Sequence, residues 1–192
     1  ILAGSNAGAI ENCITRGTLN AETAVGGITG KNEETGSVSR SENEAAIDGK
    51  MQTGGIAGLN EGGISDCVNS GKINTNQKIK KQAEGDGSSV NISIPNAVTG
   101  LTADERANET GGIAGNSSGD ISYCTNTATI GFERLGSSTG GIVGRQLGSL
   151  SYCANKGVVY GHKNVGGISG VLEPYEESSY DRDYRQELSD EL

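Results

Sequence analysis

The sequence predicts an all-β fold, a parallel β-helix, or solenoid, of about five coils. The motif Gly-Gly-Ile-x-Gly occurs five times, and a second block, Gly-x-Ile-x-x-Cys-x-Asn-x-Gly-x-Ile, follows with small changes in each unit. Apolar runs within a unit are too short for helices and are bounded by Gly or Asn, which is typical of strands. Apart from one unit with a large insertion, the units span about 24 to 29 residues, as expected for a repeat architecture.

Composition supports repetition as the source of order. The chain of 192 residues has 32 Gly, 2 Pro, 4% aromatic residues and no Trp, which excludes a core of large interlocking side chains. The glycines are periodic and Ile and Val fall between them, which argues against a disordered low-complexity chain. One domain built by stacking the units is therefore expected over residues 1–172.

Each unit is expected to form one coil of three short strands that pair in parallel with their equivalents at about 4.8 Å. Glycine at the corners supplies a positive φ or lets one backbone approach the next. Stacking predicts three apolar columns: Ile10, Val38, Ile64, Ile121 and Leu150; Leu19, Ile47, Ile73, Ile130 and Val159; and Leu2, Ile28, Ile56, Ile113, Ile142 and Ile168.

Net charge narrows the classes of partner. A charge of −9, from 24 acidic and 15 basic residues, argues against nucleic acid and against an anionic membrane surface. No run of 18 or more apolar residues is present, so no membrane insertion is expected. The sequence starts inside a repeat, without Met or a signal region, and we expect a fragment of a longer polypeptide with other domains.

The combined motif resembles the GLUG-motif repeats of secreted and surface-attached bacterial proteins, which also occur in non-catalytic regions of IgA-specific metalloendopeptidases. The resemblance covers residues 1 to about 170. It implies a right-handed parallel β-helix and an extracellular or cell-surface location. It implies no catalytic residue, since His-Glu-x-x-His is absent and His162 is the only histidine; we expect no enzyme activity.

Four cysteines share one position of the repeat, with Ser41 in the second coil: Cys13, Cys67, Cys124 and Cys153. An extracellular location raises the possibility of disulfides. Side chains stacked in one parallel column point the same way, however, whereas a disulfide needs a torsion near ±90°, so we favour free, buried thiols. A linear column also gives no tetrahedral zinc site.

An asparagine column lies two residues further on, at Asn43, Asn69, Asn126 and Asn155, with Thr15 in the first coil. It is either a polar strip for a ligand or a corner ladder in which each amide bonds the turn backbone and its stacked neighbour. We favour the ladder, because Asn also tolerates the left-handed conformation that corners demand.

Calcium-binding glycine-rich β-rolls place Asp at a fixed slot after Gly-Gly-x-Gly. Here the slot holds Asn32, Asn60, Ser117, Leu147 or Leu172, and no Asp recurs. No metal and no cofactor are therefore expected.

Tyr123 and Tyr152 share a column and are the candidate ligand-binding residues, because two aromatic rings can stack on a sugar. Alternatively they pack together as an ordinary cross-strand pair. A polysaccharide-degrading site would need converging carboxylates, and Glu11, Asp66 and Asp120 are scattered between columns.

The repeat is broken twice. An insertion at about 77–110, with a basic start and an acidic close that includes Glu109, is either a binding loop or a decoration without a partner. The tail at 173–192 is expected to cap the solenoid, with Tyr180, Tyr184, Leu188 and Leu192 on one helix face, or to link to another domain.

These observations favour a structural or adhesive repeat segment of a bacterial surface protein, which presents or spaces other modules and binds a host protein or glycan. The alternative is a carbohydrate-binding or polysaccharide-degrading β-helix.

Overall fold

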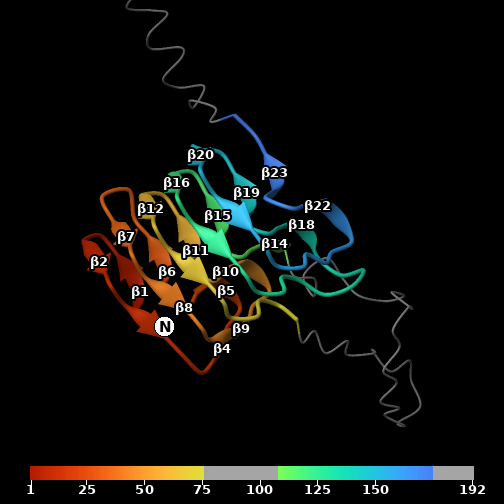
Figure 1. Ribbon diagram of the computed structural model, residues 1–192, viewed down its shortest axis with the longest axis horizontal. Helices are drawn as coiled ribbons and strands as arrows, with labels where there is room; N and C mark the ends of the chain where they lie inside the picture. Colours follow the sequence, from red (N-terminus) through yellow and green to blue (C-terminus); the bar gives the residue numbers. More distant parts are fainter. Residues whose placement is uncertain (76–107, 175–192) are drawn as a thin grey trace, which may run out of the picture.

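The predicted fold class is confirmed. The computed structural model describes residues 1–75 and 108–174, and this part of the chain is all-β, with parallel strands stacked as a solenoid of about five coils (Figure 1). In the figure the coils follow one another from the red N-terminal coil to the blue strands of the last turn.

The strands are short, and their order repeats from coil to coil. The first coil contains β1 (Ala3–Asn6), β2 (Ala9–Glu11), β3 (Ile14–Thr15), β4 (Thr18–Asn20) and β5 (Thr23–Gly26). The second contains β6 (Thr29–Asn32), β7 (Ser37–Ser39), β8 (Glu42–Asn43), β9 (Ala46–Asp48) and β10 (Met51–Gly54). The third contains β11 (Ala57–Asn60), β12 (Gly63–Ser65), β13 (Val68–Asn69) and β14 (Asn108–Gly111).

The fourth coil contains β15 (Ala114–Ser117), β16 (Asp120–Ser122), β17 (Thr125–Asn126) and β18 (Ser137–Gly140). The fifth contains β19 (Val143–Gln146), β20 (Leu150–Ser151), β21 (Ala154–Asn155) and β22 (Lys163–Gly166), and β23 (Ser169–Leu172) begins a further turn. From the third coil on, the place of β4 and β9 is taken by single bridges at Ile73, Ile130 and Val159.

Equivalent strands form parallel sheets in the orders β1-β6-β11-β15-β19-β23, β22-β18-β14-β10-β5, β2-β7-β12-β16-β20, β21-β17-β13-β8-β3 and β4-β9. The expectation of three strands per coil was therefore wrong. Strands such as β6 and β8 carry no large apolar side chain, so the apolar pattern did not reveal them. Register continues across the insertion, where Ala57 pairs with Ala114 and Gly54 with Gly111.

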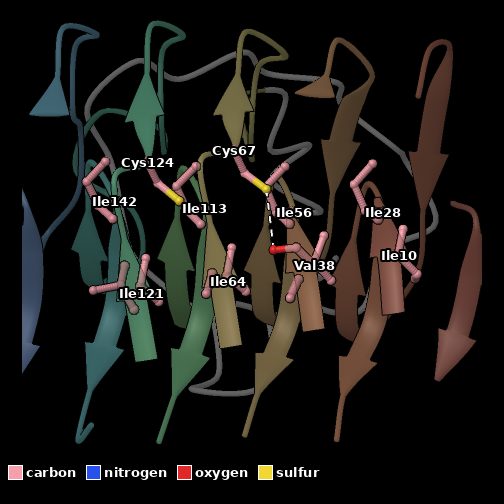
Figure 2. Packing of buried hydrophobic residues seen from close by; sticks show 13 residues of the cluster. Ile10, Ile28, Val38, Ile56, Ile64, Cys67, Ile113, Ile121, Cys124 and Ile142 are labelled. Atoms are coloured by element: carbon pink, nitrogen blue, oxygen red, sulfur yellow. Dashed lines mark hydrogen bonds between the residues drawn. The ribbon is translucent and has the colours of Figure 1, made fainter. Parts of the chain in front are cut away.

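The three predicted apolar columns are present. Figure 2 shows two of them, the row of Ile28, Ile56, Ile113 and Ile142 and the row of Ile10, Val38, Ile64 and Ile121, which join Cys67 and Cys124 in one buried cluster. The remaining column packs with Val25 in a second cluster, through Leu19, Ile47, Ile73 and Ile130. Burying one such side chain contributes roughly 1.5 to 3 kcal/mol, and each column distributes this gain over all the coils.

Most glycines of the repeat serve the predicted close approach of one backbone to the next, whereas Gly17 has the predicted positive φ, at 105°. A Cβ on Gly55 would lie 2.2 Å from the Gly112 carbonyl oxygen and 2.3 Å from Oδ1 of Asn69. One on Gly58 would lie 2.3 Å from the backbone of the facing strand at Val25. Most corner residues with positive φ are not glycine, which explains why the glycine pattern and the corners do not coincide.

Both departures from the repeat fall largely outside the described residues. The predicted insertion ends too late, because the solenoid resumes with β14 at Asn108. Glu109 belongs to that strand, 3.5 Å from Arg145 of the fifth coil's β19, and not to the insertion's acidic close. The predicted capping helix, with Tyr180, Tyr184, Leu188 and Leu192, lies outside the described residues.

Candidate functional site

The predicted asparagine ladder is confirmed, and we call Thr15, Asn43, Asn69, Asn126 and Asn155 the corner ladder. Nδ2 of each asparagine donates to Oδ1 of the next at 2.8 Å, and the Thr15 hydroxyl donates to Asn43 at 3.0 Å. Nδ2 of Asn69 also donates to the Gly71 carbonyl at 2.9 Å. These asparagines do not have positive φ, so that part of the expectation was wrong. Because its amides are satisfied internally, the ladder serves the fold and not a ligand.

A second ladder, which sequence reasoning missed, occupies the repeat position that holds Asp in calcium-binding β-rolls. Nδ2 of Asn6 donates to Asn32, Asn32 to Asn60 and Asn60 to the Ser117 hydroxyl, at 2.8, 2.8 and 3.0 Å. The next member is Gln146, in register with Ser117, and not Leu147. The recurrence of Asn6, Asn32 and Asn60 at nearly equal intervals was the signal that could have revealed this ladder. From Asn6 to Ser117 the slot is thus filled by polar side chains that bond one another, whereas Gln146 donates to the Gly119 and Ser149 carbonyls.

The cysteine column lines the core. The four thiols are free; Cys67 and Cys124 are buried, while Cys13 and Cys153 are half-buried. The Sγ atoms donate to the carbonyl two residues earlier, as Cys67 does to Ser65 at 3.1 Å, and the Ser41 hydroxyl does the same in the second coil. Figure 2 shows Cys67 also donating to the Val38 carbonyl. The column therefore behaves as small core side chains with weak donors.

Cys153 is expected to be alkylated faster than Cys67 or Cys124. The neighbouring Cys124 side chain lowers the pKa of Cys153 to about 7, whereas Cys153, Cys67 and burial raise the pKa of Cys124. Because the thiolate is the nucleophile, the rate at Cys153 should rise up to about pH 8 and then level off. Mass spectrometry of peptides after iodoacetamide pulses measures this order. The control is Cys153→Ser, because serine already occupies the cysteine position of the second coil, at Ser41. First labelling of Cys67 or Cys124 would contradict the assignment.

Tyr123 and Tyr152 are brought together on the outer surface. Their rings stack with centroids 4.8 Å apart and planes inclined by 6°. Tyr123 is 57% exposed and Tyr152 77%, so the stack, which we call the aromatic corner, lies in solvent. No tyrosine hydroxyl bond is found within residues 1–75 and 108–174. The predicted alternative of mutual packing describes the contact, but it does not explain why two large rings remain exposed.

The backbone at these tyrosines is unusual for their type. The column at this corner consists of Asn12, Arg40, Asp66, Tyr123 and Tyr152, whose φ values are 53°, 47°, 53°, 54° and 51°. Asn and Asp tolerate this left-handed region, whereas a bulky side chain there is uncommon and costs on the order of 1 kcal/mol. The fold alone would therefore favour Asn or Asp at both tyrosine positions.

Polar side chains lie directly beside the aromatic corner, and we call Asp120, Ser122, Ser149 and Ser151 the polar strip. Ser122 and Ser151 precede the two tyrosines, pair in register, and make no side-chain hydrogen bond in the described part of the chain. The exposed Ser149 hydroxyl donates to the exposed carboxylate of Asp120. The strip thus presents both donors and acceptors to solvent.

In the described ranges, no group of three or more His, Cys, Asp or Glu side chains is arranged to hold a metal ion. Within the same ranges, no helix has the length and apolar character needed to cross a membrane.

The fold and these surfaces define a parallel β-solenoid with an exposed aromatic pair. No protein-family model, curated protein or solved structure matches this chain. The resemblance to GLUG-motif repeats stays a prediction from the residues.

Proposed function

We propose that the chain is a structural and adhesive repeat segment of a bacterial extracellular or cell-surface protein. In this role the solenoid spaces or presents other modules of its polypeptide and binds a host or matrix partner. The GLUG-like motif supports the proposed bacterial surface location.

The observation that carries the spacer role is the continuity of the stacking. Parallel pairing runs through all coils, and the corner ladder bonds the first coil to the fifth without a break. Such a stack is stiff along its axis, because bending it would part hydrogen bonds in several sheets at once. The recurring residues are used for folding, which leaves the variable outer side chains for partners.

Single-molecule stretching between the two termini tests the spacer role. A stiff segment should resist extension and then unfold cooperatively at a force well above that needed to extend an unstructured linker. Gradual lengthening at low force would contradict the proposal.

A bead assay tests adhesion. Beads coated with the chain are applied to immobilised matrix proteins and glycans, with soluble chain as competitor.

The second candidate, a carbohydrate-binding or polysaccharide-degrading β-helix, is favoured by the aromatic corner. Binding is the form that the exposed tyrosines support, since stacked rings supply an apolar surface for a sugar.

A further inference from the structure

We propose that the aromatic corner and the polar strip together bind an uncharged glycan. This inference rests on the adhesive role proposed above and gives it a site and a class of ligand.

The aromatic corner supplies the apolar part of the site. The face of a pyranose ring that carries C–H groups is apolar and packs on an aromatic ring, while the tyrosine hydroxyls stay available as donors and acceptors. Tyr152 is the more exposed of the pair and offers the larger free surface. A stacked partner behind it, at 4.8 Å, holds its ring in place before any ligand arrives.

The polar strip supplies the groups that sugar hydroxyls require. Asp120 is an acceptor, and the hydroxyls of Ser122 and Ser151 can donate or accept. Since each serine is joined directly to a tyrosine, a sugar on the rings is within one residue of the strip. The rigid parallel pairing of β16 with β20 fixes the spacing between these groups.

Charge selects against anionic ligands. Asp120 belongs to the strip, and Asp66 occupies the corner column one coil before Tyr123. The whole chain also carries a net charge of −9. Two nearby carboxylates would repel uronate or sulfate groups, so the site is suited to uncharged sugars.

The backbone conformation at this corner indicates a substitution that should remove binding without disturbing the fold. Asn12 occupies the same column with φ of 53°. Replacing both tyrosines by asparagine therefore keeps a residue that this corner accepts and removes only the rings.

The test measures binding of the full chain to neutral β-glucan, chitin and galactan oligosaccharides and to polyuronate and heparin oligosaccharides. We expect binding to at least one neutral series, weakened at least tenfold in the Tyr123→Asn/Tyr152→Asn variant, with an unchanged or higher thermal midpoint. Tyr123→Phe/Tyr152→Phe, which keeps the stack, should retain most of the affinity. Ser151→Ala should weaken binding less than loss of the rings.

Four results would overturn the inference: no binding to any neutral series, preference for the anionic series, unchanged affinity in the asparagine variant, or unfolding of that variant while the phenylalanine variant stays folded. The last result would assign the tyrosines to packing. None of these results would change the outcome of the stretching test or of adhesion to a matrix protein. The glycan inference can therefore fail while the proposed function stands.

Discussion

Replacing Gly55 by alanine is expected to destabilise the solenoid by at least about 3 kcal/mol, or to prevent folding. The new Cβ would lie 2.2 Å from the Gly112 carbonyl oxygen and 2.3 Å from Oδ1 of Asn69. Neither atom can move freely, because one belongs to the backbone of the next coil and the other accepts the amide of Asn43 at 2.8 Å. Urea unfolding followed by circular dichroism measures the loss.

Gly63→Ala is the matched control, since a Cβ there meets no heavy atom within 4 Å. This variant should be neutral, or more stable by about 0.4 to 1 kcal/mol through the lower entropy of the unfolded chain. Equal losses at both glycines would show that close approach between coils is not the reason for the repeated glycine.

Asn69→Ala should lower the free energy of unfolding by about 2 to 4 kcal/mol. Its side chain donates to Asn126 and Gly71 and accepts from Asn43, and it is fully buried, so truncation leaves unsatisfied groups on both neighbouring coils. Asn116→Ala, on the half-buried position of β15, is the control and should change stability by less than about 0.5 kcal/mol. Denaturant midpoints of the two variants give the comparison, and similar values would contradict the ladder's role.

Asn69→Asp adds a dependence on pH. The carboxylate would face the Gly71 carbonyl and Oδ1 of Asn126, which raises the pKa of the new group in the folded state above its unfolded value. The protonated form therefore fits the fold better, and stability should fall as pH rises through the folded pKa. Denaturant midpoints between pH 3 and about 7 measure the trend, and constant stability over that range would contradict it.

How far the sequence determines this structure depends on which residues recur together. Ile, Gly and Asn at fixed positions predicted the fold, the apolar columns and the corner ladder, because stacking in register brings equal residues into contact. The strand count was wrong because β6 and β8 have no apolar signal. For Gly55 the sequence left two roles open, positive φ and close approach, and the contact with the Gly112 carbonyl of the next coil decides for close approach.

The candidate site was likewise predicted only in part. That Tyr123 and Tyr152 share a column followed from the spacing, but their exposure and left-handed backbone did not. The polar strip was missed, although Ser122 and Ser151 hold one repeat position, which is also serine at Ser39 and Ser65. The members of the strip lie side by side because β16 pairs in parallel with β20.

The in-register stack across the insertion is the central claim, and a double-mutant cycle on Asn69 and Asn126 tests it most directly. These residues are 57 positions apart in sequence yet joined by a hydrogen bond of 2.8 Å. Their alanine substitutions should couple by about 1 to 3 kcal/mol, whereas Asn69 and Asn6, which share no partner, should be additive within about 0.5 kcal/mol. Additivity of Asn69 and Asn126 would contradict the stacked solenoid.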